Sequence, residues 1–221
     1  MIVRDFLSDF VMPVKPTDSA GVAMQWMGEY HLAQLPIVEE RKLIGIISED
    51  AILDTPDPEA NVSEIRFRGW DGAFAREGSH VYDALNLMTN LNLEVAPVLN
   101  DQDQYVGVVT IREVATGLSE LFAVQSPGGV MVLQVPANSY VLSEIGRIVE
   151  SEGAKVLSLY LSSVPGSGDM LITLKLNVED LSRIVSSFNR FEYQVVHVFH
   201  RSLNPDDYKR NYDALIRYLD I

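Results

Sequence analysis

The strongest constraint on the fold of this 221-residue chain is an internal repeat. The run Leu35-Pro36-Ile37-Val38 recurs 61 residues later as Ala96-Pro97-Val98-Leu99. The run Leu43–Ser48 (LIGIIS) recurs 62 residues later as Tyr105–Thr110 (YVGVVT), with a glycine at the same place in both. A repeat of several motifs in the same order predicts two similar structural units that pack together.

Each copy has the pattern helix, strand, turn, strand, helix. Asp18 and Ser79 are the predicted N-caps of the first helix in each copy. Polar turns at 39–42 and 100–103 separate two short apolar strands and predict a hairpin. A second helix is expected to begin near Ser48 and near Thr110. The apolar residues of the first helix fall on one helical face, and they are Ala23, Trp26, Met27 and Tyr30 in the first copy and Ala84, Leu85, Met88 and Leu91 in the second.

This unit resembles a CBS domain, because proline opens the first strand and Gly-hydrophobic-hydrophobic-Ser/Thr closes the second. The resemblance covers about residues 1–121 as two copies. We expect CBS units at 1–58 and 59–125, with the turn-rich stretch Thr55-Pro56-Asp57-Pro58-Glu59 as their connection.

The second half has a different pattern, which begins after a break at Ser126-Pro127-Gly128-Gly129. It predicts a strand over 130–135, a helix from about Ser139 that ends at Glu152-Gly153, two strands that carry Leu157, Leu159 and Leu161 and then Met170 to Leu176, a second helix around Leu181–Phe188, and a last strand over 194–199. This order is the ferredoxin-like βαββαβ plan. It resembles an ACT domain over about residues 129–200.

We therefore expect an α+β chain, with an ACT-like domain at 126–201 and an amphipathic helix at 202–221. Asn204 and Pro205 suit the start of that last helix. Its apolar stripe, which we expect to pack on this chain or on a partner, is Tyr208, Tyr212, Leu215, Ile216 and Leu219.

The CBS resemblance also suggests where a ligand would bind. It implies a Ser or Thr after the second strand and an Asp three residues later, which contact the phosphate and ribose of a nucleotide. Here Ser48 is followed by Ala51, and Thr110 by Glu113. Arg112 is placed to meet a phosphate in the second copy, where the first copy has Asp50. The candidate ligand residues are thus Thr110, Arg112, Glu113 and Ser48; the alternative is that Ser48 and Thr110 only cap helices.

Tyr140 and the four histidines give no indication of ligand binding, catalysis or metal binding. Tyr140 takes the place where amino-acid-binding ACT domains carry glycine, which favours packing there. His197 and His200 are three apart on a predicted strand, so they face opposite sides and form no metal pair. His31 and His80 lie in separate copies. We predict no catalytic residue and no metal site.

Composition narrows the function further. A net charge of −14 opposes binding to nucleic acid. The chain has no cysteine, so disulfides and thiolate chemistry are excluded. Asp5 and Asp9 interrupt any signal-like apolar run near Met1, and no run approaches the length of a membrane span. We expect a soluble cytoplasmic protein with no membrane contact.

The order CBS–CBS–ACT resembles the acetoin-utilisation-type CBS–ACT regulatory proteins. The resemblance implies a non-enzymatic homodimer that requires no cofactor and senses a small metabolite, an adenine nucleotide or a related ligand, in the CBS cleft. The alternative is a ligand-free dimerisation or scaffold module that acts through a protein partner. An enzyme of unrecognised type is a third hypothesis, which no residue constellation supports.

Overall fold

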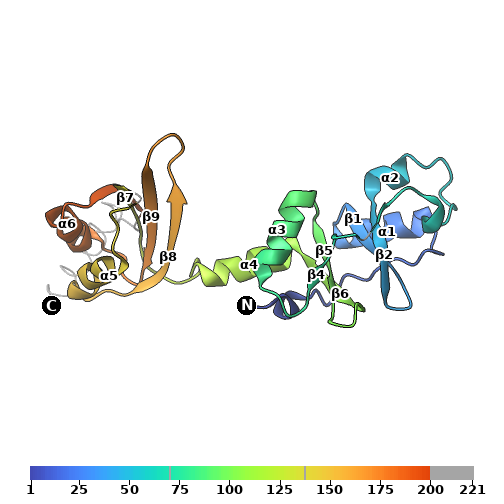
Figure 1. Cartoon of the computed structure of the whole chain (residues 1–221), viewed down its shortest axis with the longest axis horizontal. Coiled ribbons are helices and arrows are strands. Elements are labelled where there is room, and N and C mark those ends of the chain that lie inside the picture. The colour runs from blue at the N-terminus through green and yellow to red at the C-terminus, as the bar shows by residue number, and fades with distance from the viewer. Residues whose placement is uncertain (70, 137, 200–221) are drawn as a thin grey trace, which may run out of the picture. The chain divides into compact units, whose positions relative to one another are not determined.

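The computed structural model describes residues 1–69, 71–136 and 138–199, and the chain forms two compact units, Met1–Leu118 and Ser119 onward (Figure 1). The predicted helix at 202–221, Trp70 and His200 lie outside the described residues. The mixture of helices and sheets confirms the predicted α+β class.

Both repeats of the first unit contain the predicted elements. The first copy consists of α1 (Ala20–Tyr30), β1 (Gln34–Glu39), β2 (Lys42–Ser48) and α2 (Glu49–Leu53). The second consists of α3 (Val81–Leu91), β5 (Val95–Leu99), β6 (Tyr105–Thr110) and α4 (Ile111–Leu121). Short elements precede each copy: η1 (Val3–Phe6) before the first, and η2 (Val62–Glu64), β3 (Arg68–Gly69) and β4 (Ala75–Arg76) before α3.

The two hairpins have the same register. Ile37 lies opposite Gly45 in the first, and Val98 lies opposite Gly107 in the second. Each strand pairing then shifts directly after that position, between Ile37 and Val38 and between Val98 and Leu99. A shared bulge at repeat-equivalent positions confirms that the two copies are equivalent folding units.

The N-caps lie one residue beyond those predicted. The hydroxyl of Ser19 accepts a hydrogen bond from the Val22 N–H, and Nδ1 of His80 accepts one from the Tyr82 N–H. The predicted caps have other roles: the Asp18 carboxylate accepts from the Lys15 N–H, and the Ser79 hydroxyl donates to the Arg76 carbonyl. The prediction failed because Asp-Ser and Ser-His each place two side chains with acceptor atoms next to each other.

Part of the segment that precedes each copy packs with the other copy, an exchange that the sequence did not predict, whereas Val14 stays with the first copy and Ala75 with the second. Residues before the first copy complete the second: the Val3 N–H donates to the Ser79 carbonyl at 2.9 Å. Residues before the second copy complete the first: the Val62 N–H donates to the Asp18 carbonyl at 2.8 Å. Asp18 and Ser79 are equivalent positions of the repeat. The side chains involved are Val3, Phe6 and Leu7 in the core of the second copy, and Val62, Ile65 and Phe67 in the core of the first.

Hydrogen bonds and apolar contacts also join the two copies directly. The Ala33 N–H donates to a Glu94 carboxylate oxygen at 2.8 Å, and the Glu94 N–H donates to the Gln34 side-chain carbonyl at 3.1 Å. The Gln34 amide nitrogen donates to the Asn92 carbonyl. Buried Val38, Leu43 and Leu99 form one small core between the hairpins.

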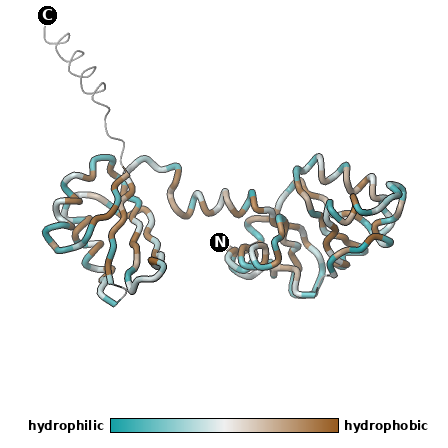
Figure 2. The backbone as a smooth tube through the Cα atoms, turned by 90° about the horizontal axis from the view of Figure 1, so that it is seen from above, coloured by the Kyte–Doolittle hydropathy of each residue, from teal (hydrophilic) through white to brown (hydrophobic). Residues whose placement is uncertain are grey.

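The second unit is a single antiparallel sheet with two helices. Its elements are β7 (Val130–Pro136), α5 (Leu142–Ser151), β8 (Val156–Ser163), β9 (Asp169–Leu176), α6 (Ser182–Arg190) and β10 (Gln194–Phe199), and the strand order is β10-β7-β9-β8. The predicted element order is confirmed. Helices and strands share one core, and apolar residues concentrate along the central strands (Figure 2).

Two details of this unit differ from the prediction. The first helix begins at Leu142 and not near Ser139. On β8 the pairing shifts between Val156 and Ser158, so Val156 and Leu159 pack against the core while Leu157 is exposed. The simple alternation expected for 157, 159 and 161 is therefore wrong, because a bulge changes the side to which the first of these side chains points.

The candidate ligand clefts

The larger of two equivalent clefts lies at the start of α4. It is a cavity of about 570 Å³ formed by three segments: residues that precede the first copy, the end of α1, and residues 110–113. We call it the Thr110 cleft. Three of the four predicted ligand residues line it, namely Thr110, Arg112 and Glu113; its other lining residues are Ser8, Phe10, Val11, Glu29, Tyr30, His31, Leu32 and Ile111.

Ser48, the fourth predicted residue, lies in a separate cleft. This Ser48 cleft has a volume of about 240 Å³, and its lining residues are Ala33, Gln34, Ser48, Glu49, Asp50, Asn92, Leu93 and Glu94. The repeat relates the two clefts, since Ser48 is equivalent to Thr110 and Asn92 to His31. The structure thus brings together the candidates of the second copy only.

At the start of α4, hydrogen bonds connect Thr110 with Glu113. The Thr110 N–H donates to Oε2 of Glu113 at 3.1 Å, and the Thr110 hydroxyl donates to the same oxygen. The Arg112 N–H donates to the Thr110 hydroxyl oxygen at 3.2 Å. A Glu that reaches back from the third helical position to the cap residue is a feature of the capping box. In the Ser48 cleft the hydroxyl of Ser48 accepts from the Ala51 N–H at 3.3 Å. Both hydroxyls therefore act as caps, which supports the alternative left open above.

The two clefts differ in charge. The Thr110 cleft contains one guanidinium, Arg112, together with Glu29 and Glu113. Within the described residues, no carboxylate lies within ion-pair distance of Arg112, which is exposed. The Ser48 cleft is lined by Glu49, Asp50 and Glu94, and no lysine or arginine is among its described lining residues. Because like charges repel, the Ser48 cleft opposes an anionic ligand.

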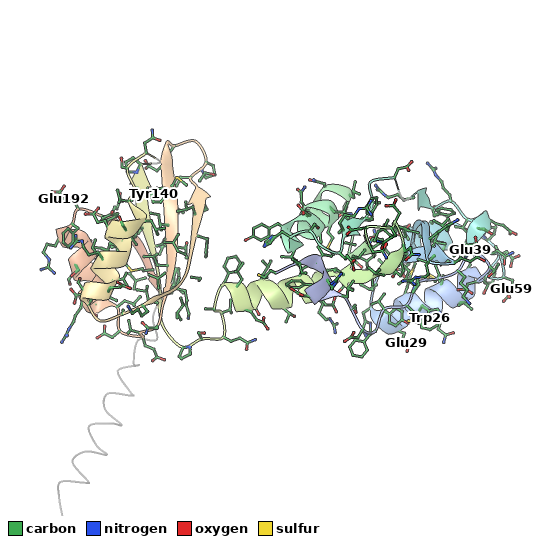
Figure 3. The ribbon with its side chains drawn as sticks, turned by 60° about the horizontal axis from the view of Figure 1, so that its bottom comes forward. Trp26, Glu29, Glu39, Glu59, Tyr140 and Glu192 are labelled. Atoms are coloured by element: carbon green, nitrogen blue, oxygen red, sulfur yellow. The ribbon has the colours of Figure 1, made fainter. Side chains whose placement is uncertain are left out.

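Two aromatic residues, Tyr30 and Phe10, line the Thr110 cleft. Tyr30 stands at the end of α1, with its ring centroid 5.4 Å from that of Trp26 one turn earlier. Trp26 and Glu29, labelled in Figure 3, belong to the same helix. Phe10 is 79% exposed. Burial raises the pKa of Tyr30 above its ordinary value, with a smaller contribution from Glu29, whereas a hydrogen bond with the Met12 backbone opposes the shift.

The sequence pattern missed the cleft residues that lie outside the Ser/Thr motif. His31 ends α1 in the left-handed region at φ 55°, and Asn92 ends α3 at φ 52°. The repeat did contain a signal for these two cleft residues, because His31 and Asn92 occupy equivalent positions and neither is a glycine. Phe10 precedes both copies, and no local pattern connects it with α4.

The remaining candidates have structural positions. Tyr140 packs against the core of the second unit, as predicted. His80 caps α3. The described residues contain no group of three or more His, Asp or Glu side chains placed to hold a metal ion. Within the same residues, no helix has both the length and the apolar character needed to cross a membrane.

The first unit consists of two equivalent helix–hairpin–helix copies and has two equivalent clefts, which defines a tandem-repeat module. Comparison with known families identifies the family of the repeated domain. The CBS domain family model matches residues 3–56 and 73–120, so the first unit is a tandem pair of CBS domains.

Known proteins are similar in sequence to part of this chain. An inosine-5'-monophosphate dehydrogenase of Methanocaldococcus jannaschii is 25% identical over 143 residues, which are 64% of this chain and 28% of that protein. The similar enzyme of Korarchaeum cryptofilum is 27% identical over 128 residues, 58% of this chain and 25% of that protein. The chain thus spans about a quarter of the length of these relatives.

Solved structures are similar in fold. A protein of Methanocaldococcus jannaschii matches with a TM-score of 0.50 and 19% identity, over 55% of this chain and 61% of that one. A CBS domain pair/ACT domain protein of Thermotoga maritima matches with a TM-score of 0.48 and 17% identity, over 54% of this chain and 98% of that one. At such identities the likeness concerns the fold alone.

Proposed function

We propose that this chain is a non-enzymatic regulatory protein that senses a small metabolite, an adenine nucleotide or a related adenosine compound, in the Thr110 cleft. The single observation that carries the proposal is the difference between the two equivalent clefts. One is large, lined by aromatic rings and supplied with a guanidinium, whereas the other is small and lined by three carboxylates.

The Thr110 cleft has suitable dimensions and chemistry for such a ligand. Its volume of about 570 Å³ lies within the range of small-molecule sites. Tyr30 and Phe10 supply aromatic surface on which a base can stack. Arg112 supplies a planar cation that pairs with a phosphate or carboxylate.

The position of the cleft suits a regulatory role. Tyr30 comes from the end of α1 in the first copy, Phe10 comes from the segment before it, and Thr110, Arg112 and Glu113 come from the second copy. A ligand that contacts both copies has an affinity that depends on how they are arranged. Such a ligand favours one arrangement over another, which is the requirement for a switch.

For the second unit we propose an ACT-like, ferredoxin-like domain. The support is its strand order β10-β7-β9-β8 with a strand–helix–strand–strand–helix–strand sequence. We further propose a homodimer as the working assembly, which light scattering on the full chain tests directly.

The experiment is isothermal titration of the full chain with AMP, ATP, S-adenosylmethionine and a set of amino acids. Arg112→Ala removes the guanidinium from the cleft, and we expect it to weaken an anionic ligand by about 10- to 100-fold, since a charged hydrogen bond contributes about 1.5–3 kcal/mol. The matched control is Asp50→Ala at the equivalent position of the Ser48 cleft, which we expect to leave the affinity within about twofold. Absence of heat across the whole panel would overturn the proposal, as would equal losses in the two variants.

A further inference from the structure

We infer that Glu113 determines the specificity of the Thr110 cleft, because its carboxylate occupies the position at the start of α4 where a phosphate would bind. The cleft then prefers an adenosine compound whose 5′ group is neutral or cationic over the corresponding phosphate. The adenosine part of this inference rests on the proposed function, whereas the occupied anion position rests on the contacts of Glu113 alone.

Several polar groups at the start of α4 are already bonded to Glu113 or to one another. The first N–H groups of a helix have no partner within the helix and attract anions. Here the Thr110 N–H and hydroxyl both donate to Oε2 of Glu113, and the Arg112 N–H donates to the Thr110 hydroxyl oxygen. Thr110 is only 4% exposed, so its bonds to Glu113 are protected from water. A phosphate at this position has to displace a carboxylate that remains beside it.

Capping alone does not require this carboxylate. The first copy has Ala51 at the position equivalent to Glu113, and α2 there is capped by the hydroxyl of Ser48. A hydroxyl without a glutamate is therefore sufficient to start the second helix of a copy. The glutamate adds negative charge inside the larger cleft, next to Arg112.

The other charges around the cleft do not cancel this effect at the helix start. Glu29 adds a second carboxylate, His31 is exposed, and Arg112 follows Thr110 by two residues. We assign Arg112 to an anionic group farther along the ligand, such as the carboxylate of S-adenosylmethionine. A sulfonium next to Glu113 would experience attraction where a phosphate experiences repulsion.

The test compares adenosine, AMP and S-adenosylmethionine by calorimetry on the wild-type chain and on Glu113→Gln. Glutamine serves in a capping box as glutamate does, so the variant loses charge and keeps the cap. We expect AMP to bind about tenfold tighter to the variant, which corresponds to about 1.4 kcal/mol, and adenosine to stay within about twofold. We expect S-adenosylmethionine to bind more weakly to the variant. Glu120→Gln, on the same helix and outside the cavity lining, is the matched control and should change none of the three affinities.

A separate probe keeps this inference distinct from the proposed function. Inorganic phosphate is titrated into both proteins while the amide resonances of Ile111 and Arg112 are followed. If no adenosine compound binds either protein, the proposed function fails, but phosphate that shifts these amides at lower concentration in Glu113→Gln still supports the occupied anion position. Equal phosphate affinity in the two proteins, or AMP weakened by Glu113→Gln, would overturn the inference.

Discussion

The exchange of leading segments can be tested with two helix glycines of the first unit. Gly117 lies in α4, where a Cβ would overlap the ring of Phe6 from the exchanged N-terminal segment. Gly28 lies in α1, where an added Cβ meets no atom within 4 Å. Alanine at either position gains up to about 1 kcal/mol of helix propensity. At Gly117 alone, overpacking against Phe6 costs about 1–3 kcal/mol.

We therefore expect opposite signs for the same chemical change. Gly28→Ala should stabilise the first unit by about 0.5–1 kcal/mol, and Gly117→Ala should destabilise it by about 1–2 kcal/mol. In combination with Phe6→Ala, which removes the ring, the alanine at position 117 should cost less than it does alone, with a coupling energy of about 1–2 kcal/mol.

The assay is urea denaturation of the full chain, followed by tryptophan fluorescence. Both tryptophans, Trp26 and Trp70, belong to the first 118 residues, so the signal reports on the first unit. With a urea dependence of about 1–3 kcal/mol per molar, the expected changes shift the midpoint measurably. If Gly117→Ala proves as stabilising as Gly28→Ala, then Phe6 does not pack against α4 and the exchange is refuted.

Two further predictions concern single hydrogen bonds. Gln34→Ala removes the side chain that bonds to the Glu94 N–H and the Asn92 carbonyl, and we expect a loss of about 1–2 kcal/mol in the same urea assay, with no change if the copies are not joined there. In the second unit, burial, and then the hydrogen bond to Glu144, raise the pKa of Tyr193 to about 12. Because the folded pKa lies above the unfolded value of about 10, the protonated form stabilises the fold below pH 10, and this contribution is lost as the pH rises from about 10 to 12. Tyr193→Phe should cost about 1 kcal/mol at pH 8 and remove that loss, as followed by circular dichroism; an unchanged alkaline profile would contradict the assignment.

The repeat was enough to predict both copies and the hairpin within each, since equivalent glycines and prolines mark equivalent hairpins, but it did not predict the third strands β3 and β4. Local pattern did not resolve which of two adjacent acceptor side chains caps a helix, as with Asp18 and Ser19. It also did not reveal the exchange, because Val3 and Val62 have the same apolar character whichever copy they complete. Contacts between residues distant in sequence depend on the path of the chain, which periodicity does not describe.

The candidate site was predicted in part. Thr110, Arg112 and Glu113 follow one another closely in sequence, so one helix start brings them to one cleft. Ser48 occupies the equivalent position of the other copy and therefore the other cleft. Tyr30 and Phe10 complete the Thr110 cleft from elsewhere in the chain, and only the pairing of the two copies places them there.

The exchanged segments also set the order of events during synthesis. When the ribosome has made the first helix–hairpin–helix copy, the residues that will fill its core, Val62, Ile65 and Phe67, have not yet emerged. Val3 has by then been synthesised, but the second copy, in whose core it packs, has not. The core of the first copy can form once Phe67 has emerged, whereas Val3 and Val38 reach their partners in the second copy only as the chain extends toward Leu118, so the first unit reaches its final packing late in synthesis.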